Sequence, residues 1–214
     1  MRFLPILLLL ASACQKNVEK PVDPLQKPAE LPVAQTTTTA PAVFDPELEF
    51  RTVRERTLPA VNDRLPRSLM DRLQFGPQID DKHRVVAVVP VNWTVDPQTG
   101  AYRPPLSANL GAATSMTFGS GCDGRCTVKD WPAAFDKVEI RRQELQKIES
   151  DEPIGPNGRL VVAQSGSLKL VMAGLWKPEA NRYFFCRASL EGAAMEALPA
   201  FLTACRSLDV RHWE

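Results

Sequence analysis

The sequence predicts an α+β domain in which helices flank an antiparallel sheet, forming an α/β/α sandwich. Three strand-like segments follow one another with short joins, and short joins require antiparallel neighbours; they are residues 159–164, 168–176 and 182–190. Val85–Val89 is a continuous apolar run, which is typical of a strand covered on both faces. Apolar residues at helical spacing in residues 130–149 and 191–206 predict the covering helices.

The first part of this domain has weaker patterns. Residues 49–56 alternate charged and apolar side chains and predict an edge strand. Pro66 is placed to open a helix that carries Leu65, Leu69 and Leu73 and that stops at Gly76-Pro77. We expect residues 80–82 to form a polar turn.

Two further strands are expected before the main helix. Residues 91–95 predict a short strand, and residues 97–105 a loop. In residues 112–118, Thr114, Met116 and Phe118 alternate with polar residues, as in a half-buried strand.

The two helices have apolar rows that predict packing on the sheet. After Asp130 as N-cap, the first row is Trp131, Phe135, Val138, Leu145 and Ile148, with charged residues on the other face. The second row is Met195, Leu198, Leu202 and Cys205. Pro199 predicts a kink or a late start of that second helix. Residues 207–210 are expected to return as a short strand.

The first fourteen residues have the pattern of an export signal. One positive charge at Arg2 precedes an apolar run, then the small residues 11–13, then Cys14. This stretch resembles a bacterial lipoprotein signal peptide, with Ala11 where the family prefers a bulky aliphatic residue. The resemblance implies cleavage before Cys14 and acylation of Cys14, which anchors the protein in a membrane. The alternative is an ordinary secretory signal with Cys14 near its end.

These observations divide the chain into three parts. Residues 1–13 are the signal peptide, residues 14–47 the lipidated N-terminus with a linker rich in proline and threonine, and residues 48–214 one globular domain. As a flexible coil, the linker would hold its ends roughly 30 Å apart. Gln15, in place of an aspartate that retains lipoproteins at the inner membrane, implies an outer-membrane location facing the periplasm. We therefore expect a lipid-anchored protein of the bacterial cell envelope.

Four cysteines remain after Cys14, and an exported chain predicts two disulfides among them. The three pairings are open, and Cys122–Cys126 with Cys186–Cys205 is favoured. Cys186 shares the more apolar face of its strand, and Cys205 lies on the apolar row of its helix, so both point into one interface. The alternative is that Cys122 and Cys126 form a redox pair or a soft-metal site.

Composition argues against several classes of function. The chain has 26 Lys and Arg, 25 Asp and Glu and a net charge of +1, without the clustered basic residues of a nucleic-acid binder. There are two histidines, His83 and His212, and no phosphate-binding, dinucleotide-binding or nucleophile motif. We expect no metal site, no cofactor and no catalytic residue. The four tryptophans are expected mainly in the core, with Trp213 the one best placed to touch a partner.

The order of elements from Lys82 to Val210 resembles the Mog1/PsbP-like family. The resemblance rests on Val88–Trp93, on the strand series 159–190 and on a terminal helix that leads into Ser207–Val210. It implies an α/β/α sandwich without shared catalytic residues, in a family of binding and accessory proteins. The expected function is a non-enzymatic binding or accessory lipoprotein with a protein partner. The alternatives are a periplasmic immunity protein that neutralises a toxin, and a thiol-redox or metal-handling protein that uses Cys122 and Cys126.

Overall fold

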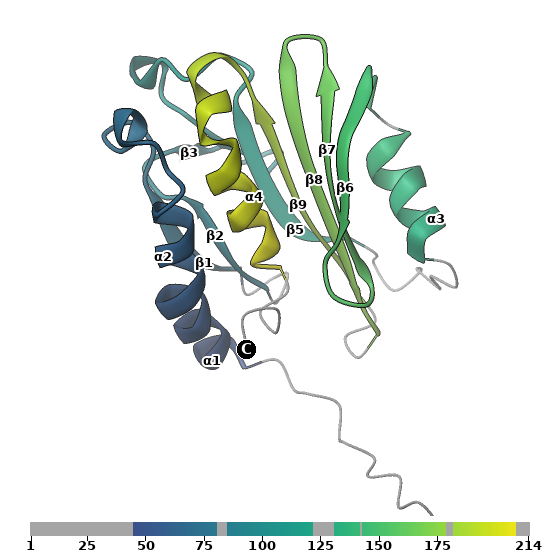
Figure 1. Cartoon of the computed structure of the whole chain (residues 1–214). Coiled ribbons are helices and arrows are strands. Elements are labelled where there is room, and N and C mark those ends of the chain that lie inside the picture. The colour runs from purple at the N-terminus through teal and green to yellow at the C-terminus, as the bar shows by residue number, and fades with distance from the viewer. Residues whose placement is uncertain (1–44, 81–84, 122–130, 142, 179–181, 209–214) are drawn as a thin grey trace, which may run out of the picture. The chain divides into compact units, whose positions relative to one another are not determined.

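An antiparallel sheet of seven strands forms the middle layer of the domain, in the order β3-β4-β5-β9-β8-β7-β6 (Figure 1). The computed structural model describes residues 45–80, 85–121, 131–141, 143–178 and 182–208. The strands are β3 (Thr94–Val95), β4 (Tyr102–Arg103), β5 (Ser115–Gly121), β6 (Lys147–Pro153), β7 (Gly158–Ser165), β8 (Leu168–Lys177) and β9 (Arg182–Leu190). Helices lie on both faces of this sheet, so the predicted α+β sandwich is confirmed.

The larger core lies on the face covered by α4 (Leu198–Arg206), which follows η6 (Gly192–Ala197). A second, two-stranded sheet of β1 (Phe75–Asp80) and β2 (Val85–Pro90) completes this core. So does the N-terminal helical segment, which consists of α1 (Pro46–Thr52), η1 (Val53–Thr57) and α2 (Leu58–Asn62). Every residue of β2 is buried, as its continuous apolar run predicts.

On the opposite face of the sheet, the described part of the chain supplies one short helical segment as cover. It consists of α3 (Trp131–Phe135) and the π-helical η4 (Asp136–Ile140), seen beside β6 in Figure 1. Beneath it lies a smaller apolar cluster of Phe135, Val161, Ala163, Leu170, Met172 and Tyr183. Alternation along β9 separates the two cores, because Phe184 and Cys186 face α4 while Tyr183 and Phe185 face α3.

The expected edge strand at residues 49–56 is wrong, because this segment is helical in α1 and η1. The Asp45 side chain accepts hydrogen bonds from the backbone N–H groups of Glu47 and Leu48, at 3.0 and 3.1 Å. Pro46 occupies the first turn. A capping aspartate followed by proline is a strong helix start, and it outweighs the alternation of charges that follows.

The expected helix over residues 65–73 is reduced to a single 3-10 turn, η2 (Arg67–Leu69). Leu65, Leu69 and Leu73 are all buried, but in turns instead of a regular helix. Gly76 and Pro77, predicted to end that helix, belong to β1. Pro77 is tolerated there because β1 pairs with β2 alone.

The main predicted helix, residues 130–149, is much shorter than expected. It ends at Ile140, and Ile148 and Glu149 belong to β6, which pairs with β7. Of the expected strand at residues 91–95, only Thr94–Val95 is a strand. Ser207 and Leu208 form a turn, so no strand begins there. The strands at β5, β7, β8 and β9 lie where expected within a few residues, and α4 starts late, with Pro199 in its first turn.

Candidate functional site

The helical segment of α3 and η4 lies over the smaller apolar cluster. Three of its side chains point inwards and are spaced four residues apart: Trp131, Phe135 and Glu139. Phe135 and Glu139 are completely buried, and Trp131 is half-buried. Glu139 lies in the π-helical turn η4, which widens the helix where this carboxylate meets the sheet. A fully buried acidic side chain needs compensating partners, because leaving water disfavours its charge.

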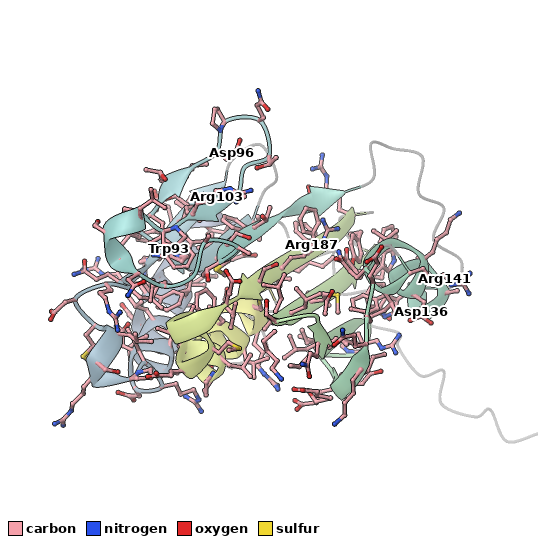
Figure 2. All side chains as sticks on the ribbon, turned by 90° about the horizontal axis from the view of Figure 1, so that it is seen from above. Trp93, Asp96, Arg103, Asp136, Arg141 and Arg187 are labelled. Atoms are coloured by element: carbon pink, nitrogen blue, oxygen red, sulfur yellow. A yellow bond between two sulfur atoms is a disulfide. The ribbon has the colours of Figure 1, made fainter. Side chains whose placement is uncertain are left out.

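Two side chains of β9 supply those partners. Arg187 donates from Nε to Glu139 Oε2 at 2.5 Å and from Nη2 to Oε1 at 2.8 Å. The Tyr183 hydroxyl donates to the same Oε1 at 2.9 Å. We call Glu139, Tyr183 and Arg187 the Glu139 cluster. Figure 2 shows Arg187 on the side of the molecule that carries Asp136 and Arg141 of the helical segment.

The charges within this cluster reinforce one another. Hydrogen bonding to Glu139 raises the pKa of Arg187, so the guanidinium keeps its charge. Burial, and then the Glu139 charge, raise the pKa of Tyr183 well above its usual range, so its hydroxyl stays protonated and remains a donor. All three donors are engaged with one carboxylate, and the arrangement therefore fastens the helical segment to β9.

Aromatic rings continue the contact on either side of the cluster. Tyr183 lies between Trp131 and Phe185, with ring centroids 5.6 and 6.3 Å away. The Arg187 guanidinium stands 4.4 Å from the centroid of the Phe185 ring. This stacking adds a cation–π contact to the ion pair and holds Arg187 flat against the sheet.

A second group of charges fastens the same segment to β7. Arg159 donates to Asp136 of η4 at 2.6 Å and to Asp151 of β6 at 2.5 Å from Nη2. The hydrogen bond from Arg159 lowers the pKa of Asp151. Arg159 also lies 5.2 Å from the centroid of the Phe135 ring. The helical segment is thus tied to the sheet by an arginine on each side of Phe135.

A different kind of surface is formed by five exposed apolar side chains in segments that hydrogen bonds join to one another. We call it the apolar end, and its members are Met70, Val91, Val95, Leu106 and Met195. Leu106, in the 3-10 turn η3 (Leu106–Ala108), is 94% exposed. Pro104 and Pro105 precede this turn, and Asn109 ends it with a φ of 48°. Prolines before a tight turn restrict the backbone of this segment.

Hydrogen bonds join the segments of the apolar end to one another. Asn92 donates to the Arg72 carbonyl at 3.2 Å, and Arg72 reaches the Ala108 carbonyl at 3.4 Å. The Ala194 backbone N–H donates to the Leu110 carbonyl at 3.3 Å. Beside Val95, Asp96 accepts from the backbone N–H groups of Gln98 and Thr99, which lowers the pKa of Asp96. Figure 2 shows Asp96 near Arg103 of β4, away from Arg187.

The residues singled out from the sequence have different outcomes. Cys14, Cys122 and Cys126 lie outside the described residues, as do His83, His212 and Trp213. Cys186 and Cys205 are joined by a disulfide between β9 and α4, and both are buried. Trp93 is buried against Phe201, with ring centroids 5.9 Å apart.

Sequence reasoning missed the Glu139 cluster and the apolar end. Glu139 was assigned to the charged outer face of its helix, although its spacing of four from Phe135 places it on the inward row. Tyr183 and Arg187 alternate with the apolar residues of β9. This alternation indicates that they lie on the opposite face of the strand, but it does not indicate what they contact. The apolar end had no local signal, because its members come from five separate segments.

The described residues include no helix long and apolar enough to cross a membrane. They also include no group of three or more histidine, cysteine, aspartate or glutamate side chains placed to hold a metal ion. The sequence matches no known family model, and a comparison with curated proteins finds no relative.

Proposed function

We propose that this protein is a lipid-anchored, non-enzymatic binding or accessory module of the bacterial cell envelope. The observation that carries the proposal is the apolar end, where Leu106 is 94% exposed in a 3-10 turn that follows two prolines. Apolar side chains that gather on a soluble surface mark contact sites, because their burial against a partner is favourable. The partner we propose is a protein, and nucleic acid is not expected.

The N-terminal helical segment runs from α1 towards the turn η2, which Met70 of the apolar end follows. The proposed tether joins the domain at α1, and α1, η1 and α2 together run from Pro46 to Asn62. At 1.5 Å per residue this segment is about 25 Å long. Figure 1 shows α1 at one end of the domain, and η2 follows α2 at the other end.

The anchor is tested by replacing its acylation site. Wild-type protein produced in bacteria is expected to incorporate radiolabelled palmitate and to fractionate with membranes. A Cys14→Ala variant is expected to lose the label and to remain an uncleaved precursor. Label that persists in Cys14→Ala, or a wild-type protein recovered unlabelled in the soluble fraction, would contradict lipidation at Cys14.

The contact surface is tested by site-specific photo-crosslinking in intact cells. A photoreactive residue at position 106 is expected to give one discrete product that disappears when Met195→Asp is added. The matched control is position 148, because Ile148 is also apolar and 45% exposed but lies on the edge strand β6. The same products from both positions, or none from position 106, would refute a specific contact at the apolar end.

The two alternative functions are separated by different measurements. An immunity protein would bind one toxin tightly and abolish its activity, which a purified toxin can report. A thiol-redox or metal-handling protein would keep Cys122 and Cys126 reactive. Alkylation of the exported protein under denaturing, non-reducing conditions therefore decides the second case, because two disulfides leave no thiol of the mature domain to label.

A further inference from the structure

The two faces of the seven-stranded sheet are closed in different ways. On one face, the Cys186–Cys205 disulfide ties α4 covalently to β9 over the larger apolar cluster. On the other face, where the structure describes residues 131–141, α3 and η4 contact the sheet through side chains, namely the Glu139 cluster, the Arg159 pairs and a few apolar contacts. The second face is therefore the less firmly closed of the two.

Lifting the helical segment would break no strand pairing. At the end of the helical segment, backbone hydrogen bonds run back to the segment and not to the sheet. The Arg141 N–H donates to the Asp136 carbonyl, and the Gln143 N–H donates to the Ile140 carbonyl. The strands beneath keep their own ladders, from β5 across β9 and β8 to β7. Opening thus costs side-chain contacts while the sheet retains its hydrogen bonds, which is the physical basis of local opening in folded proteins.

The charged contacts stabilise the closed state, and the hydration of the same groups in the open state lowers the free energy of opening. In the closed state Glu139 is fully buried, and its carboxylate has given up water for Arg187 and Tyr183. When the segment lifts, these groups regain hydration, which offsets much of the attraction that is lost. An apolar residue at position 139 would have no such compensation in the open state.

We propose that α3 and η4 form a cover that opens as a unit while the sheet and α4 stay folded, with the Glu139 cluster as its latch. Opening uncovers the apolar strip formed by Val161, Leu170, Met172 and Tyr183 on three adjacent strands. This device is independent of the apolar end and of the lipid anchor. It adds a second apolar surface that is present only in the open state.

The methionines of the chain provide the test. Met172 is 2% exposed and lies under the cover, whereas Met116 is 0% exposed and lies in the larger core on the other face. Peroxide oxidises a methionine sulfur only when it can reach it. The full-length protein in detergent is exposed to hydrogen peroxide, and the sulfoxide at each methionine is followed by peptide mass spectrometry. Exposed Met70 and Met195 give the unprotected rate.

Local opening predicts that Met172 oxidises about tenfold faster than Met116 in the wild-type protein. A Glu139→Gln exchange weakens the latch. It is expected to accelerate the oxidation of Met172 by about tenfold and to leave the oxidation rate of Met116 unchanged. The matched control is Glu152→Gln, because Glu152 pairs with Arg206 of α4 on the other side of the sheet. That control is expected to leave the oxidation of Met172 unchanged.

Two results would overturn the cover. One is that Met172 oxidises as slowly as Met116 in the wild-type protein. This comparison needs no variant, so it holds even if Glu139→Gln fails to fold. The other is equal acceleration of both methionines in Glu139→Gln, because that reports opening of the whole domain. A Tyr183→Phe exchange provides a milder weakening of the latch, since it removes one donor and keeps the Arg187 pair.

Discussion

Gly174 of β8 faces Phe135 and Tyr183 without a side chain of its own. A Cβ atom at this position would lie 2.4 Å from the Tyr183 hydroxyl oxygen and 2.8 Å from a Phe135 ring carbon. Both distances are shorter than van der Waals contact, so the helical segment or the tyrosine must shift. The absence of a side chain at residue 174 is what lets the helical segment approach the sheet.

A Gly174→Ala exchange is expected to lower the free energy of unfolding by about 1–3 kcal/mol, the usual cost of overpacking. Urea denaturation of the full chain measures it. A Tyr183→Phe exchange removes the nearer atom, so its cost should be smaller in the Gly174→Ala background than in the wild type. Equal costs in the two backgrounds would show that Gly174 and Tyr183 do not compete for the same space.

Glu139 shows where sequence reasoning about single residues fails. Its helical spacing placed it on the inward row, but an acidic side chain is ordinarily assigned to solvent because burying a charge is costly. The compensating Arg187 lies 48 residues further along the chain, on a strand. Only the pairing of helix and strand reveals that the two charges meet.

At the scale of elements, the Cys186–Cys205 disulfide joins two segments whose mutual packing the sequence predicts well. The alternation of β9 and the apolar row of α4 each place a cysteine in the same interface. The closed loop spans a sequence separation of 19 residues. In the chain-entropy account such a loop stabilises the fold by about 3 kcal/mol.

A double exchange, Cys186→Ala with Cys205→Ala, is expected to lower the midpoint of thermal unfolding by about 6–12 °C. Calorimetry of the oxidised wild type beside the variant measures the change. Reducing agent should shift the unfolding midpoint of the wild type towards that of the variant. It cannot act on the variant through this bond, because the variant lacks it. An unchanged midpoint in the oxidised comparison would show that the bond does not constrain the unfolded chain.

Other elements were predictable only in part, for identifiable reasons. The three long strands after residue 157 were found because alternation and short joins act together there. The first residues of β6, 147–149, fall in the predicted helix, because the charged edge position of this strand leaves it exposed and without alternation. The helix at α1 has local signals in its capping aspartate and proline. The alternation of charged and apolar residues after them is also typical of a strand, so the two signals conflict.

At the scale of the whole molecule, the division into a tether and a domain can be tested directly. Limited proteolysis of the full-length protein is expected to cut within residues 15–44, where the sequence predicts a linker. The remaining fragment should begin near Asp45, the cap of α1, and keep the unfolding transition of the intact chain. Mass spectrometry and calorimetry of the fragment check both points, and first cuts inside β7–β9 would contradict the division.

The apolar end emerges only at this scale. Its five side chains span residues 70 to 195 and lie in segments that the fold joins through hydrogen bonds. Each is unremarkable in its own segment, since single exposed apolar residues are common on protein surfaces. The fold class could therefore be predicted from the sequence, whereas the candidate contact surface could not.

The outer border of the sheet has a consequence for what happens when copies of this protein meet. The edge strand β6 is interrupted by a bulge between Ile148 and Ser150, carries charged side chains along its length and ends at Pro153. Such a border is a poor template for another strand. Copies that meet edge to edge, as they would at high density on the lipid surface that we propose, therefore do not fuse into a continuous ribbon.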